Sequence, residues 1–210
     1  MTDVAQLTVP VQRWIARHRH RESAPPRPTR VPAELPPDVR LHRRRVQQLG
    51  ACTRLLGLVQ AESHYPASRP RSLREWLADP ALLDAWVAER QGELLGHVAL
   101  GPIGEDAVSR MRWREVTGRP AADLGGVSRL FVRPRSRGQG IGKALLAIAA
   151  EDVRARGLTP VAEVVSPSRE GVGLFEQQGW RLVGRSATGR RGEELTTYLY
   201  LLPPTVTATG

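Results

Sequence analysis

The sequence predicts an α/β domain with a mixed, partly antiparallel sheet flanked by helices. Short strand-like and helix-like segments alternate along most of the chain. A glycine-rich turn joins a strand directly to a long helix within residues 127–156. Two pairs of strand-like segments, within 84–100 and 180–202, are close enough along the chain to form antiparallel hairpins.

Each expected element follows from a local pattern. Apolar residues at helical spacing predict helices, Ser72 is suited to cap a short helix, and Arg90-Gln91-Gly92 is typical of a hairpin turn. The polar segment 101–125 fits no regular element. The expected strands are 39–45, 84–89, 93–100, 127–132, 159–165, 180–185 and 195–202, and the expected helices are 46–62, 73–78, 138–156 and 168–178.

The two ends of the chain differ from this alternating region. Residues 1–45 hold ten arginines against four acidic residues, and six prolines lie between Ala24 and Pro37. Proline-rich, basic sequence favours extended chain over a packed core. We therefore expect a basic extension at 1–37, one folded domain at 38–202 and a short tail at 203–210.

The composition limits the class of protein. A 40% hydrophobic content can form a core, while no apolar run approaches the roughly 18 residues of a membrane span. The single cysteine, Cys52, excludes an internal disulfide and a cysteine zinc cluster. We expect a cytoplasmic protein without a metal. The net charge of +10 comes mostly from arginine in the N-terminal arm, and without a reading motif it does not predict nucleic-acid binding.

The most informative segment is Arg137-Gly-Gln-Gly-Ile-Gly-Lys143, which lies between the expected strand and helix. The first turn of a helix leaves backbone N–H groups unpaired at the positive end of the helix dipole. A phosphate or pyrophosphate is the natural occupant. Glycine lets the backbone approach the anion closely, and Arg137 and Lys143 add positive charge.

Two common phosphate-binding motifs do not fit this turn. A P-loop needs glycine where Arg137 stands and Ser or Thr where Ala144 stands. A dinucleotide fingerprint fails because its third glycine would fall on Lys143 or on Leu145, depending on the register. The pattern that fits is Arg-x-x-Gly-x-Gly.

That pattern, after Leu130-Phe-Val-Arg-Pro and before a helix, resembles the acetyl-CoA motif of the GNAT superfamily of N-acetyltransferases. Glu163-Val-Val-Ser-Pro-Ser168, followed by Leu174-Phe-Glu-Gln-Gln-Gly-Trp180, is similar to the second motif of that superfamily. The resemblance covers about residues 38–202 and implies the GNAT fold.

The resemblance implies binding of acetyl-CoA and transfer of its acetyl group to the amine of a small molecule or peptide. The pyrophosphate would lie on the turn, and the pantetheine arm would run along strand 127–132, where a backbone N–H of Val132 or its neighbour polarises the thioester carbonyl. The residues expected to bind acetyl-CoA are Leu130, Phe131, Val132, Arg137, Gly138, Gln139, Gly140, Ile141, Gly142, Lys143 and Ser168.

Glu163 is the expected general base, because its position resembles that of the base in ribosomal-protein alanine acetyltransferases. Strand alternation places it on one face with Val161 and Val165. We therefore expect a partly buried carboxylate facing the cleft between strands 127–132 and 159–165. An outward-facing surface glutamate is the alternative, and the base would then be among Glu105, Asp106, Glu115 and Asp123.

Two positions depart from the superfamily pattern. Many relatives have at position 175 a tyrosine that protonates the departing thiolate, whereas this chain has Phe175. The role of general acid then passes to water, Tyr198 or Tyr200. Ser168 stands where asparagine is usual. These departures favour one alternative function, a catalytically weak acyl-CoA-binding module whose basic arm recruits a partner or nucleic acid. A homodimer is compatible with the sequence.

Overall fold

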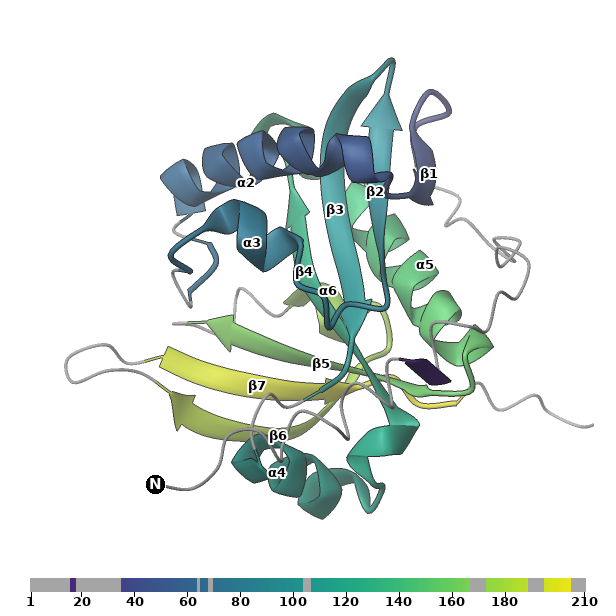
Figure 1. Cartoon of the computed structure of the whole chain (residues 1–210). Helices are drawn as coiled ribbons and strands as arrows, with labels where there is room; N and C mark the ends of the chain where they lie inside the picture. The colour runs from purple at the N-terminus through teal and green to yellow at the C-terminus, as the bar shows by residue number, and fades with distance from the viewer. Residues whose placement is uncertain are drawn as a thin grey trace, which may run out of the picture.

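The computed structural model describes residues 16–17, 35–63, 65–67, 70–103, 107–166, 173–188 and 195–204. Its strands form one mixed sheet in the order β1-β2-β3-β4-β5-β7-β6 (Figure 1). Strands β4 and β5 pair in parallel, and all other neighbours pair antiparallel. The strands are β1 (Arg40–Arg43), β2 (Asp84–Arg90), β3 (Glu93–Gly101), β4 (Leu124–Val132), β5 (Thr159–Ser166), β6 (Arg181–Thr188) and β7 (Leu195–Leu201). This architecture confirms the predicted fold class.

Helices cover both faces of the sheet. Helices α2 and α3 pack over β2–β4 through a cluster that includes Val87 and Phe131, and α4 packs over β5 and β7 on the same face, through Val161 and Leu199. Helix α5 covers the opposite face. The helices are α2 (Leu49–Ser63), α3 (Leu73–Leu77), α4 (Ala107–Thr117), α5 (Ile141–Ala155) and α6 (Gly173–Gln177), with short 3-10 turns at Val46–Gln48, Ala121–Asp123 and Pro134–Ser136.

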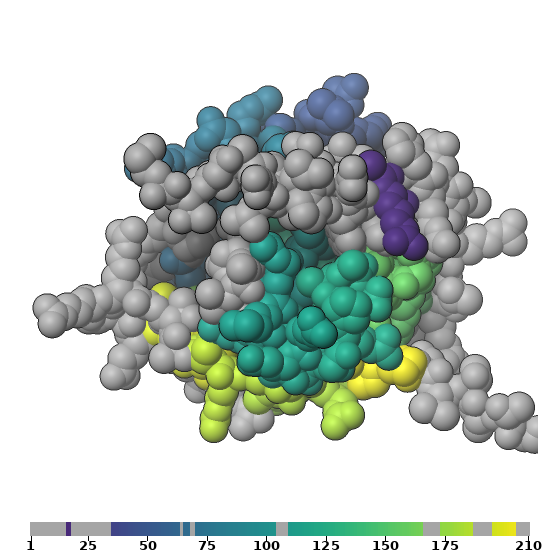
Figure 2. Space-filling view, turned by 60° about the horizontal axis from the view of Figure 1, so that its bottom comes forward, coloured from purple at the N-terminus to yellow at the C-terminus, as the bar shows by residue number. Residues whose placement is uncertain are grey.

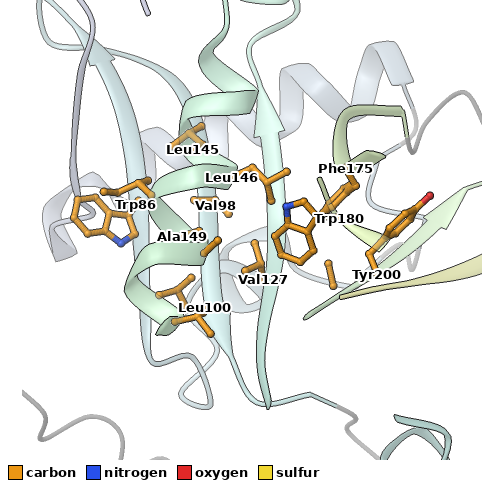
Figure 3. Close-up of a cluster of buried hydrophobic side chains, with 14 of the residues drawn as sticks. Trp86, Val98, Leu100, Val127, Leu145, Leu146, Ala149, Phe175, Trp180 and Tyr200 are labelled. Carbon is orange, nitrogen blue, oxygen red and sulfur yellow. The ribbon is translucent and has the colours of Figure 1, made fainter. Parts of the chain in front are cut away.

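The largest core cluster lies between α5 and the sheet. Figure 3 shows Leu145, Leu146 and Ala149 of α5 directed toward the strands, with an aromatic group continuing the cluster toward α6 and β7. Leu145 and Ala149 are fully buried. Full burial of one leucine stabilises a fold by about 1.5–3 kcal/mol, so this face holds α5 firmly against β3 and β4.

Local chemistry explains the predicted boundaries that the structure confirms. Gln91 and Gly92 both have positive φ, 49° and 84°, as the tight turn of a two-residue hairpin requires. The Ser72 side chain accepts a hydrogen bond from Glu75 N and so caps α3. Gly157 follows the last turn of α5 with φ 76°, the usual helix-ending conformation.

The structure corrects other boundaries. Segment 101–125, unassigned from sequence, contains α4 and the start of β4. Helix α5 begins at Ile141 rather than Gly138, because Gly140 is its N-cap residue with a left-handed backbone. Of the helix expected at 168–178, the structure has α6 from 173 to 177, and residues 167–172 lie outside the described part.

Packing extends past both expected domain boundaries. Leu35 packs against the main core cluster, and Val39 N donates to Pro36 O at 2.9 Å. At the other end, Arg154 Nη2 donates to Pro203 O at 2.6 Å. The folded region therefore includes residues 35–37 and 203.

A buried polar network fixes the C-terminal half of α5 against the sheet. Asp152, whose side chain is 2% exposed, accepts hydrogen bonds from Trp86 Nε1 at 2.9 Å and Arg156 Nε at 3.0 Å. Arg156 and Arg43 also pair with Asp84 of β2. Because these contacts fix how α5 sits on the sheet, they also fix the position of its N-terminus.

Candidate active site

The sheet divides in the middle, between β4 and β5. The two strands pair at Leu124, Gly125 and Gly126, opposite 159–161, and have no paired residues beyond that point. Figure 1 shows them diverging toward the N-terminal end of α5. A Cβ on Gly125 would lie 2.6 Å from Val153 Cγ1 of α5, so glycine is needed where the helix crosses the branch point.

Backbone groups of β4 border this gap. Arg133 N donates to Leu95 O of β3 at 2.7 Å. Because successive N–H groups of a strand point to opposite edges, the N–H of Val132 points to the open edge of β4. The side chains of Leu130 and Val132 pack toward the α5 face, while Phe131 is 4% exposed in the cluster under α2 and α3. Backbone rather than side chains of 130–132 is thus available to the gap.

The glycine-rich turn stands at the end of β4, next to the gap. Gly138 and Gly140 have φ values of 76° and 75°. The first backbone hydrogen bond of α5 runs from Ala144 N to Gly140 O at 3.0 Å. The N–H groups of Ile141 and Gly142 precede that bond and are therefore left for an acceptor outside the helix. These N–H groups lie within segment 137–143, where the sequence predicts a pyrophosphate site.

Side chains around the turn are already engaged with neighbours. Arg137 Nη1 lies 3.2 Å from Glu62 Oε1 of α2, and both side chains are about half exposed, at 45% and 55%. An exposed pair of this kind contributes little stability, so an anion could exchange for Glu62 at low cost. Gln139 Oε1 accepts a hydrogen bond from Arg90 Nη2 at 3.2 Å, and Lys143 lies half-buried on the first turn of α5.

Glu163 shares a face of the sheet with Val161, as strand alternation predicts, and α4 covers that face. Its carboxylate accepts a hydrogen bond from Trp113 Nε1 at 2.6 Å. The expectation of a partly buried carboxylate is wrong, because Glu163 is exposed. Trp113 of α4 contacts this part of β5 without covering the carboxylate, and the next residue on that face, Val165, is also 38% exposed.

The structure does not bring Tyr198 together with Glu163. Tyr198 lies on β7 opposite Val164 and belongs to the core cluster on the α5 face. Strand β5 separates it from the gap. Tyr200 is fully buried and donates its hydroxyl to Glu176 Oε1 at 3.1 Å. These placements argue against either tyrosine as the general acid.

Other predicted residues are placed as follows. Phe175 is 7% exposed and stacks on Tyr200, with ring centroids 5.4 Å apart. Ser168, Glu105 and Asp106 lie outside the described residues. Within the described part of the chain, no group of three or more His, Cys, Asp or Glu side chains could hold a metal ion, and no helix is long and apolar enough to cross a membrane.

Sequence reasoning missed two residues of this region, Trp113 and His97. Trp113 of α4 is completely buried between this helix and the sheet, and α4 lies on the face of the molecule seen in Figure 2. His97 is also completely buried, and burial lowers its pKa to about 3. A single histidine inside the apolar run of β3 is the one signal that could have drawn attention to it.

Comparison with known proteins agrees with this geometry. The model of the acetyltransferase (GNAT) family matches residues 49–180, more than half of the chain. The chain belongs to the GNAT acetyltransferase family. The matched range includes α2, the gap between β4 and β5, the glycine-rich turn and α6. A sequence comparison with curated proteins gives no significant match.

Solved structures show the same GNAT fold. An N-acetyltransferase from Staphylococcus aureus Mu50 is 17% identical, with a TM-score of 0.61 over 78% of this chain and 97% of its own. A ribosomal-protein-alanine N-acetyltransferase from Brucella melitensis is 20% identical, with a TM-score of 0.59 over 77% and 98%. YncA from Salmonella typhimurium, solved with its cofactor acetyl-CoA, is 16% identical, with a TM-score of 0.58 over 79% and 93%.

Proposed function

We propose that this GNAT acetyltransferase moves the acetyl group of acetyl-CoA to a primary amine. The observation that carries the proposal is the junction of two features at the end of β4. The glycine-rich turn offers unpaired N–H groups to a pyrophosphate. The edge of β4 that has no partner strand among the described residues follows Gly126 and ends at Val132, just before this turn. An extended pantetheine arm can add to such an edge as a strand would.

The residues along this path have separate tasks in the proposed reaction. The turn at 137–143 binds the pyrophosphate, and Arg137 leaves Glu62 to join it. The N–H of Val132 polarises the thioester carbonyl. The amine nitrogen attacks that carbon, the carbon–sulfur bond breaks, and the coenzyme A thiolate leaves.

Glu163 is the proposed general base. An amine must lose a proton before or during attack, and a carboxylate acting through a water molecule can accept it. Two features support the assignment: Glu163 lies on β5, the other wall of the gap, and Trp113 Nε1 holds its carboxylate at 2.6 Å. Its exposure agrees instead with the outward-facing alternative, in which the base is among Glu105, Asp106, Glu115 and Asp123. The thiolate takes its proton from water, because Phe175 has no proton to donate and Tyr200 is occupied by Glu176.

The test is release of the free thiol of coenzyme A, measured over a panel of small amines and peptide N-termini. Binding of acetyl-CoA is measured separately by calorimetry. We expect micromolar binding and at least one amine that accelerates thiol release. A folded protein that does not bind acetyl-CoA would contradict the proposal.

A second candidate is a catalytically weak acyl-CoA-binding module. The buried Phe175, stacked on Tyr200, favours it because phenylalanine cannot protonate the departing thiolate. The two candidates differ in one measurement. The module would bind acetyl-CoA as tightly as the enzyme, and no amine would raise thiol release above the rate of hydrolysis.

A further inference from the structure

Strand β4 contains a bulge within the part of the strand that borders the gap. Its pairing with β3 shifts register between His97 and Ala99, and Arg129 there has φ 53°. A residue other than glycine rarely adopts this left-handed conformation. Such backbone persists only where surrounding contacts enforce it, and it is concentrated at functional sites. Bulges beside active sites also redirect the backbone that follows them.

His97 supplies the contact that enforces the bulge. Its Nδ1 lies 3.0 Å from Arg129 O. A carbonyl oxygen can only accept, so Nδ1 carries the proton and Nε2 has a free lone pair. That lone pair faces Arg44 Nη1 at 3.3 Å, and Arg44 Nη1 also donates to Leu77 O of α3. The imidazole is thus neutral, held in one tautomer, and directed at the bulge.

Further contacts hold both sides of the bulge. The imidazole stacks on Phe131, with centroids 5.0 Å apart and planes 15° from parallel. The Arg129 side chain, 9% exposed, donates to Asp79 Oδ2 at 2.8 Å and lies over the ring of Trp76 at 4.9 Å. The bulge is therefore fixed from β3 by His97 and from the α3 side by Asp79 and Trp76.

We propose that His97 is a positioning residue, which holds the β4 bulge so that the N–H of Val132 is presented to the thioester carbonyl. The inference rests on the proposed function, because the position of the β4 backbone matters only if this backbone binds the thioester. It assigns no contact between His97 and the substrate. Val132 lies three residues after Arg129. Loss of the hydrogen bond between His97 and Arg129 should therefore disturb the N–H of Val132 more than it disturbs the pyrophosphate site at the start of α5.

Two substitutions separate the hydrogen bond from the packing. His97→Phe keeps a ring against Phe131 but removes the donor, whereas His97→Asn keeps an N–H near the position of Nδ1 and loses the ring. We expect His97→Phe to lower kcat on the order of tenfold, as loss of one net hydrogen bond permits. Its affinity for acetyl-CoA should stay within about twofold, and His97→Asn should retain more of kcat. His42→Phe, in β1, is the control and should leave kcat unchanged.

The rates are measured as thiol release with the best amine of the panel, or with water as acceptor, and wild-type protein is measured in parallel. If wild type shows neither release nor acetyl-CoA binding, the proposed function fails. If wild type is active and folded His97→Phe matches it, or if His97→Asn loses as much as His97→Phe, the positioning role is refuted.

Two further measurements apply even if both His97 variants fail to fold. Arg44→Met removes the partner of Nε2 and should lower kcat by a smaller factor, without changing acetyl-CoA affinity. The ¹⁵N spectrum of wild type should show His97 as the Nδ1–H tautomer, unchanged between pH 8 and pH 5. An Nε2–H tautomer, or Arg44→Met with wild-type kcat, would overturn the inference.

Discussion

Gly140 is the residue at which the pyrophosphate site can be tested most directly. It precedes α5 with φ 75° and ψ −8°, and a β-branched residue there is a genuine outlier. In Gly140→Val the turn should relax to negative φ, which redirects the N–H groups at the start of α5. Gly118, after α4, is a matched control, since it has φ 67° and open space around its Cβ position.

The expected loss follows from the backbone conformation. A left-handed backbone costs a residue other than glycine about 1–2 kcal/mol. If the relaxed turn must return to the wild-type shape to bind pyrophosphate, this cost appears in the binding free energy. At about 1.4 kcal/mol for each factor of ten, the affinity for acetyl-CoA should fall roughly 5- to 30-fold.

The measurement is calorimetric titration with acetyl-CoA, combined with thermal unfolding of each variant. Gly118→Val should lose stability from the same backbone cost and keep wild-type affinity, because Gly118 lies outside the turn. A folded Gly140→Val protein with wild-type affinity would show that the pyrophosphate binds elsewhere. Equal loss of affinity in both variants would show that strain anywhere in the fold weakens binding.

Three other predictions concern the base, the buried histidine and the N-terminal arm. Glu163→Gln should lower turnover by a factor on the order of 10²–10⁴. The affinity for acetyl-CoA should change little, because the amide oxygen can still accept the hydrogen bond from Trp113 and so keep the local structure. A variant with wild-type turnover would exclude Glu163 as the base. The pKa of His97 is about 3 in the folded protein and about 6.5 in an unfolded chain, so the unfolded chain gains a proton first as the pH falls. His97 should therefore lower the free energy of unfolding by about 1.4 kcal/mol between pH 8 and pH 5.5. This contribution is the difference between wild type and His97→Asn in denaturant titrations, and the same pH dependence in both proteins would contradict it. Deletion of residues 1–34 should leave a folded protein that binds acetyl-CoA. Deletion that also removes Leu35 should lower the melting temperature. Loss of folding after deletion of 1–34 would show that part of the N-terminal arm belongs to the core.

Local patterns predicted the elements whose boundaries depend on nearby residues. Positive φ is found at the hairpin turn Gln91-Gly92 and at Gly157 after the end of α5. A glycine at such a position indicates this backbone conformation in the sequence. Helix α4 was missed because it packs chiefly through Trp113 and Val116. Two apolar residues that pack inward, separated by arginine and glutamate in the sequence, do not give a clear helical periodicity.

Features that depend on contacts far apart in sequence could not be predicted. Alternation correctly placed Glu163 on one face with Val161, but the exposure of its carboxylate depends on how α4, distant in sequence, packs on that face. The role of His97 depends on a bulge 32 residues away along the chain. The left-handed backbone of Arg129 could not be predicted, because arginine does not indicate a positive φ as glycine does.

Strands β4 and β5 separate after only three paired residues. The sheet therefore has open edges in its middle as well as at its two outer strands. After Gly126, the inner edges of β4 and β5 have no partner strand within the described residues. An open edge is a template for pairing with another chain, and here two such edges lie in the middle of the sheet. An occupant that adds to the edge of β4 would act as a removable strand. Amide hydrogen exchange along 127–132 should then slow when acetyl-CoA is added, and aggregation on heating should be delayed in the same samples.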